Sequence, residues 1–344
     1  MSTSGDQWAA EPYDLKDWKP GEPRIERSIT LQFIGDWGMA NFHRICSWLC
    51  QEFCDRAGPR SRVGIWNTVE GGIDAARAVF DGDVDMAIIT PAQALPAALK
   101  GTSIYAGRAM PTLRALAVLP QRDRMLLALP RALDINSFAE LRARKPALKI
   151  ATSEDNGANL IGYTARRYMA AHGVTEATLN SWGGEYINSA RPDLSLFRFR
   201  DGVANAALQE AIMTPWWREA VEARQAVILP AEPDALALLE QDHGWRKAEL
   251  AAGFFPGQDD ALPTLDFSDF VIVVRDDMPE DIAHLLTWCL IERREALERQ
   301  YHHIPSERSP LTYPLNPADM ARPSIPLHPG AQRYYDEAGI GRRD

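Results

Sequence analysis

The chain has 344 residues, of which 46% are hydrophobic and 24% are charged, a composition typical of a globular protein and a length that suggests two lobes. Its net charge of −10 argues against a nucleic-acid partner, because phosphate binding needs a basic surface, but it is compatible with a small anionic ligand in a cleft. The longest apolar runs are strand-sized, so the sequence predicts no membrane insertion.

Residues 1–27 are rich in Pro, Gly and charged residues and predict a polar N-terminal arm. This stretch lacks a basic start followed by an apolar core, so it does not resemble a secretory signal. We therefore expect a cytoplasmic location for the sequence as written, or a periplasmic location if it is a mature form.

The following residues alternate between strand-like and helix-like patterns, which predicts a parallel α/β sheet. In the first part, a strand at 28–35, a helix at 41–55, a strand and turn at 62–72, a helix at 73–80 and a strand at 83–90 follow one another. Two strand segments joined by a charged kink occupy 113–129, and a short helix occupies 137–146. The pattern restarts at 148–174, and a further strand and long helix occupy 265–300.

Two turns of the same type are found in the two halves of the chain. "FIGDWGMAN" (33–41) and "IATSEDNGAN" (150–159) each pass from a strand through a polar, Gly-containing turn to a helix that begins near an Asn. Helix N-terminal amides at such turns can bind anions. The repetition predicts two lobes that face a shared cleft, since ligands of open α/β sheets bind beyond the carboxyl ends of the strands.

Cys46, Cys50 and Cys54 recur every four residues on one helix face, and Cys289 lies far from them in sequence. This spacing matches no common zinc or iron–sulfur motif, so we expect reduced core cysteines. The histidines form no metal-binding pattern, and neither a P-loop nor a GxGxxG motif occurs. We therefore expect neither a metal nor a cofactor.

Four segments resemble the TAXI family of solute-binding subunits, which serve TRAP-type transporters: 35–42, 69–90, 254–282 and 325–335. The resemblance implies the type II periplasmic-binding-protein fold, with two α/β lobes around a ligand cleft. Lobe one would comprise 28–130 plus 266–344, and lobe two 131–265. The implied ligand is a small organic acid or an amino-acid-like molecule, and TRAP membrane subunits would be partners if the chain is exported.

The candidate ligand-binding residues lie at the ends of strands that would line this cleft. They are Gly35, Asp36, Trp37, Gly38, Asn41, Thr68, Glu70, Gly71, Thr90, Gln93, Ser153, Glu154, Asn156, Asn159 and Glu210. The family usually has small residues in the two turns, whereas this chain has Asp36, Trp37, Glu154 and Asp155 there. Asp36 could bind ligand, or it could simply cap the helix that follows.

Binding without chemical change is the favoured hypothesis, and whether the chain is an enzyme stays open. The same fold carries catalysis in proteins resembling 4,5-dihydroxyphthalate decarboxylase, to which "KIATSEDNGAN" followed by "WGGEY" is loosely similar. In that alternative, a metal-independent decarboxylase or isomerase would use Asp36, Glu154, Asp155 and His43 to transfer protons. A cytosolic ligand sensor is the third alternative.

Overall fold

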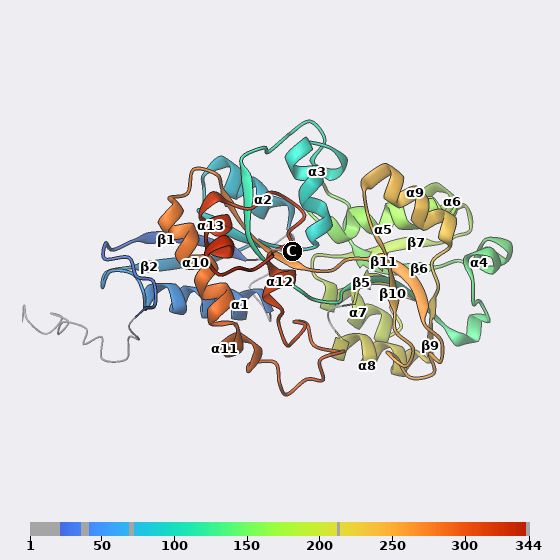
Figure 1. The fold of residues 1–344 in the computed structure, drawn as a ribbon. Helices are drawn as coiled ribbons and strands as arrows, with labels where there is room; N and C mark the ends of the chain where they lie inside the picture. Colours follow the sequence, from blue (N-terminus) through green and yellow to red (C-terminus); the bar gives the residue numbers. More distant parts are fainter. Residues whose placement is uncertain (1–20, 36–40, 69–71, 212–213, 342–344) are drawn as a thin grey trace, which may run out of the picture.

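The computed structural model describes residues 21–35, 41–68, 72–211 and 214–341, and these contain two separate β-sheets (Figure 1). We call the five-stranded sheet with its helices lobe one, and the seven-stranded sheet with its helices lobe two. Among the described residues, no helix combines the length and the apolar character needed to cross a membrane.

The five-stranded sheet has the strand order β2-β1-β3-β12-β4. β1 is parallel to β2 and β3, whereas β12 is antiparallel to β3 and β4. The strands are β1 (Thr30–Gly35), β2 (Arg62–Asn67), β3 (Met86–Ile89), β4 (Leu113–Leu119) and β12 (Phe270–Arg275).

Successive residues of these strands enter different cores, as the two-residue period of a strand requires. On β12, Phe270, Ile272 and Val274 pack with α1 (Asn41–Cys54), α10 (Glu280–Glu292) and α13 (Pro329–Glu337). Val271 and Val273 pack on the opposite face with α2 (Ile73–Asp81) and α3 (Leu95–Lys100). The shorter helices α11 (Arg294–Glu298) and α12 (Pro317–Met320) complete this lobe.

The seven-stranded sheet has the order β10-β11-β5-β8-β6-β7, with β9 paired to β5. Its strands are β5 (Arg124–Pro130), β6 (Lys149–Ser153), β7 (Glu185–Ser189), β8 (Ala206–Glu210), β9 (Ala226–Leu229), β10 (Lys247–Leu250) and β11 (Leu262–Asp266). Figure 1 shows helices on both faces of this sheet. One face packs with α4 (Phe138–Arg144), α5 (Leu160–Ala171), α6 (Glu176–Ser181) and α9 (Pro233–His243), the other with α7 (Pro192–Arg200) and α8 (Thr214–Arg224).

The chain passes between the two sheets at residues 120–123 and again at 267–269. This topology confirms the predicted α/β class and the two-lobe arrangement of the type II periplasmic-binding-protein fold. The sequence-based division places residues up to 130 in lobe one. In the structure β5 pairs with β8 and β11 of the second sheet, so it belongs to lobe two. β4 and β5 are both apolar and almost wholly buried, so their sequences do not reveal that they belong to different sheets.

The cysteine face of α1 lies in the core of lobe one. Cys46 and Cys50 are buried, and these two and Cys54 have free thiols, as the helical spacing predicts; Cys289 is also buried and free. Burial raises the pKa of the Cys50 thiol to about 12, so this group stays protonated at neutral pH.

Candidate functional site

Several strand ends of lobe one meet at the edge where the sequence predicts a cleft. Gly35 ends β1, and its carbonyl accepts a hydrogen bond of 3.2 Å from the amide of Thr68, which directly follows β2. Asn41 is the first residue of α1, and Thr90 directly follows β3. The other predicted residues of this lobe's turns, Asp36, Trp37, Gly38, Glu70 and Gly71, lie outside the described residues.

The matching turn of lobe two connects β6 to α5 and is closed by its own side chains. Asn156 Oδ1 accepts hydrogen bonds from the amides of Ala158 and Asn159, at 3.0 and 3.1 Å. Asn159 caps α5 by accepting 3.0 Å from the amide of Gly162. These asparagines therefore occupy backbone amides that a ligand anion would otherwise use.

A glycine at position 162 lets this turn fold back over the first turn of α5. A Cβ atom there would lie 2.0 Å from the carbonyl oxygen of Glu154. No side chain fits in that space, so the close approach of the turn to the helix depends on Gly162.

The two lobes touch at the turns that the sequence singles out. Gly72, at the N-terminus of α2, forms an isolated antiparallel β-bridge with Asn159, at the N-terminus of α5. A second contact joins Ser103 of lobe one to Tyr163 and His243 of lobe two. The two lobes are therefore in contact on this side.

Some predicted ligand-binding residues already have partners within the protein. The Gln93 side chain donates to the carbonyl of Asp266 and accepts 2.8 Å from the amide of Arg246, which ties lobe one to lobe two. Ser153 Oγ accepts 3.1 Å from Gln209 Nε2, and the same amide donates to Ser195 on α7.

The described residues assigned to acid–base work in the enzyme hypothesis are exposed. His43 lies on the solvent face of α1, and Glu154 is exposed in the turn before α5. Asp155 forms an ion pair with Arg167, whose guanidinium lies 3.6 Å from the centre of the Tyr163 ring. The structure does not gather these residues into a cluster of proton-transferring groups.

A buried carboxyl pair that the sequence did not reveal lies where the chain crosses between the lobes. Asp123, 1% exposed, is hydrogen-bonded to Glu210, 3% exposed, which ends β8. Asp123 Oδ1 also accepts 2.6 Å bonds from the amides of Arg124 and Ala211. Burial raises the pKa of Asp123 to about 6, because desolvation penalises its charged form more than the hydrogen bonds favour it. Two sequence signals bear on this pair: the charged kink that contains Asp123, and the place of Glu210 at the end of a strand, which made it a candidate ligand-binding residue. The structure instead buries Glu210 against Asp123.

Residues 58–339 match the NMT1-like family. This chain belongs to that family. The match covers most of lobe one and all of lobe two.

Three solved structures are among those similar to this chain. PhnD1 from Prochlorococcus marinus, in complex with methylphosphonate, is 12% identical over 91% of each chain, with a TM-score of 0.42. XAC2383 from Xanthomonas citri, bound to ATP, is 12% identical over 89% of this NMT1-like chain and 98% of its own, with a TM-score of 0.49. A binding protein component of an ABC phosphonate transporter from Pseudomonas aeruginosa is 10% identical over 82% and 77%, with a TM-score of 0.47.

Proposed function

We propose that this NMT1-like protein binds a small organic acid or amino-acid-like ligand between its two lobes, as a TAXI-type solute-binding protein does. The contact between Gly72 and Asn159 carries the proposal, because it joins the turn after β2 to the turn after β6. A ligand held between these turns would touch both lobes at once. It would bind the closed arrangement more tightly than an open one and would therefore stabilise closure.

The connections between the lobes support such a motion. Only residues 120–123 and 267–269 link the two sheets along the chain, and the described contacts across the cleft include single hydrogen bonds such as that of Gln93 with Arg246. Each such bond is worth about 0.5–1.5 kcal/mol, an amount that a bound ligand can match. If the chain is exported, membrane subunits of a TRAP-type transporter are the partners that we propose.

The metal-independent decarboxylase or isomerase remains the alternative, with the cytosolic sensor as a third. We rank binding first because Asp155 is neutralised by Arg167 and Glu154 is exposed to solvent. A general base that accepts a proton efficiently near neutral pH is usually desolvated.

The test uses the full chain and a panel of aliphatic and aromatic carboxylates and amino acids. The melting temperature is measured with each compound, and native mass spectrometry then determines the mass of any retained compound. We expect at least one compound to raise the melting temperature and to be recovered unchanged. Loss of carbon dioxide from the compound would support the enzyme, and the absence of any binding would refute the proposal.

A substitution in one of the two turns tests whether the compound binds in the space between them. Glu154→Gln changes an exposed side chain of the turn before α5 and should alter the affinity for the retained compound. Ser47→Ala, on the exposed face of α1, serves as the control and should leave it unchanged.

A further inference from the structure

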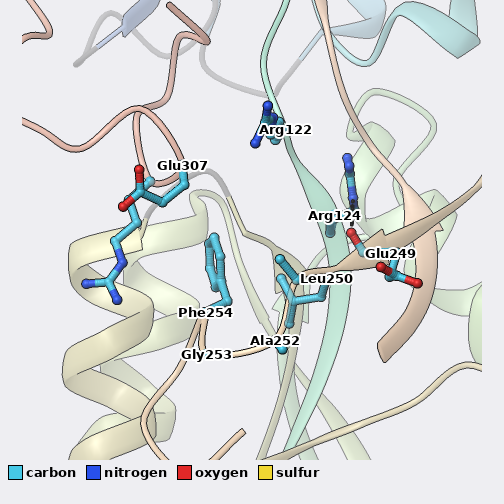
Figure 2. Close-up of a pocket in the computed structure, with 10 residues that line it drawn as sticks. Arg122, Arg124, Glu249, Leu250, Ala252, Gly253, Phe254 and Glu307 are labelled. Carbon is cyan, nitrogen blue, oxygen red and sulfur yellow. Dashed lines mark hydrogen bonds between the residues drawn. The ribbon is translucent and has the colours of Figure 1, made fainter. Parts of the chain in front are cut away.

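A cavity of about 460 Å³ lies beside the crossing between the lobes, away from the strand-end residues described above (Figure 2). Three segments line it: Arg122 of the crossing with Arg124 at the start of β5, residues 249–254 of lobe two, and Glu307 and Arg308 of lobe one. Its volume is within the range of small-molecule sites. None of the predicted ligand-binding residues lines it.

Arg122 and Arg124 share one face because they are two residues apart in an extended segment. Asp123, between them, points to the opposite face and bonds Glu210 and the amide of Ala211. Arg124 is anchored, with Nε donating 3.2 Å to the carbonyl of Glu249 and its guanidinium 3.2 Å from Asp266.

Arg122 differs from Arg124 in having no such anchor. Within the described part of the chain, its exposed guanidinium has neither a hydrogen bond nor an ion pair. A guanidinium beside a cavity can bind a carboxylate through two parallel hydrogen bonds. Arg122 is therefore the group of this cavity that is available to an anion.

The rest of the cavity provides an apolar surface. Figure 2 shows Leu250 beside Phe254, with Ala252 below them. Phe254 is held edge-to-face against Phe255, with ring centres 4.9 Å apart, and Phe255 contacts Trp217 of α8. A fixed ring of this kind suits the flat apolar body of a ligand.

We propose that this cavity is a binding site for a small monocarboxylate with an aromatic or apolar body. The carboxylate pairs with Arg122, and the body lies against Phe254 and Leu250. Arg124 is already balanced by Asp266, and Glu249 and Glu307 also line the cavity, so it suits a single negative charge better than two.

A ligand at this site would also fix the angle between the lobes. Its contacts would include Phe254 of lobe two, Glu307 of lobe one and Arg122 of the crossing itself. Because these three groups move relative to one another when the lobes separate, the ligand favours the arrangement seen here.

The experiment is isothermal titration of the full chain with phenylacetate, its neutral analogue phenylacetamide and its dianionic analogue phenylmalonate. We expect phenylacetate to bind, and both analogues to bind at least about tenfold more weakly. Arg122→Ala should weaken phenylacetate binding by about tenfold or more, and Phe254→Ala should weaken both phenylacetate and phenylacetamide. Arg60→Ala removes an exposed arginine elsewhere in lobe one and should leave affinity unchanged.

Equal phenylacetate affinity in the wild type and in Arg122→Ala, or no binding at millimolar phenylacetate, would overturn the proposal. The site is independent of the strand-end cleft, and the variants separate the two. If phenylacetate affinity responds to Glu154→Gln and not to Arg122→Ala, the cavity site is refuted and the proposed function stands. The reverse pattern would support the cavity site, and the proposed function would then depend on the other compounds of the panel.

Discussion

The hydroxyl of Ser103 lies 3.1 Å from Nδ1 of His243 and 3.3 Å from the hydroxyl oxygen of Tyr163, so one small side chain of lobe one contacts two helices of lobe two. The imidazole of His243 stacks on the ring of Trp245, with the ring centres 4.3 Å apart, and this contact holds the imidazole in place. Ser103 itself has a φ of +53°, a conformation that a non-glycine residue rarely adopts. The contact between the lobes is therefore combined with local backbone strain.

Two substitutions at Ser103 separate the hydrogen bond from the strain. Ser103→Ala removes the hydroxyl and should destabilise the protein by about 1 kcal/mol. Ser103→Gly removes the same hydroxyl, but glycine adopts a positive φ without strain. It should therefore lower the free energy of unfolding by less than Ser103→Ala does. Urea unfolding of the two variants measures the difference, and a larger loss for glycine would contradict this account.

Replacing Gly162 with alanine should destabilise the protein, although alanine is the better helix former by about 1 kcal/mol. The added Cβ would lie 2.0 Å from the carbonyl oxygen of Glu154, so the turn before α5 must move. We expect a loss of more than about 2 kcal/mol in urea unfolding. Gly157→Ala in the same turn is the control, because a Cβ there meets no atom within 4 Å and only the positive φ opposes it.

His172 should make the protein less stable in acid. His172 is 1% exposed, and its ring stacks on that of Phe138 with the ring centres 3.8 Å apart. Its Nδ1 donates a hydrogen bond to the carbonyl of Tyr168, and its Nε2 accepts one from the amide of Glu232. Burial lowers its pKa from 6.5 to about 4, so between these values the unfolded chain binds the proton more tightly. Stability should therefore fall by about 3 kcal/mol as the pH decreases through this window.

The measurement is urea unfolding of the wild type and of His172→Gln between pH 7 and pH 4. The difference in free energy of unfolding between the two proteins should shrink as the pH falls. A difference that stays constant with pH would show that His172 does not titrate with the expected pKa.

Asp123 should have the opposite effect on stability. Its pKa is raised from 3.8 to about 6, so the folded protein binds this proton more tightly than the unfolded chain does. Stability contributed by the protonated group is present below pH 3.8 and is lost as the pH rises towards 6. Asp123→Asn keeps an oxygen that can accept from the amide of Ala211 and should remove this dependence.

The His172 and Asp123 effects overlap and partly cancel between pH 4 and 6 in the wild type. Each must therefore be measured as a difference between the wild type and its variant over the same pH series. The Asp123→Asn difference should move in the direction opposite to that of His172→Gln, and equal signs would contradict one of the two assignments.

The features predicted correctly are those that depend on neighbours a few residues apart. The start of α1 at Asn41, the buried face that carries Cys46 and Cys50, and the strand, turn and helix around Asn159 follow from short-range periodicity and capping. The acidic side chains Glu154 and Asp155 were also placed correctly in the turn after β6, but the sequence could not show that Asp155 pairs with Arg167.

By itself, the sequence determined the alternation of strands and helices, the turn between β6 and α5 and hence the α/β class, because each depends on local period and on residue type. Only the tertiary structure decided that β5 pairs in the second sheet and that Asp123 meets Glu210. It also decided that Arg122 borders a cavity with Phe254. These relationships join residues far apart in the chain, such as Asp123 and Ala211 at a separation of 88, and strand pairing and lobe closure bring them together. No short-range pattern encodes such a meeting, since either partner alone resembles an ordinary surface or strand residue.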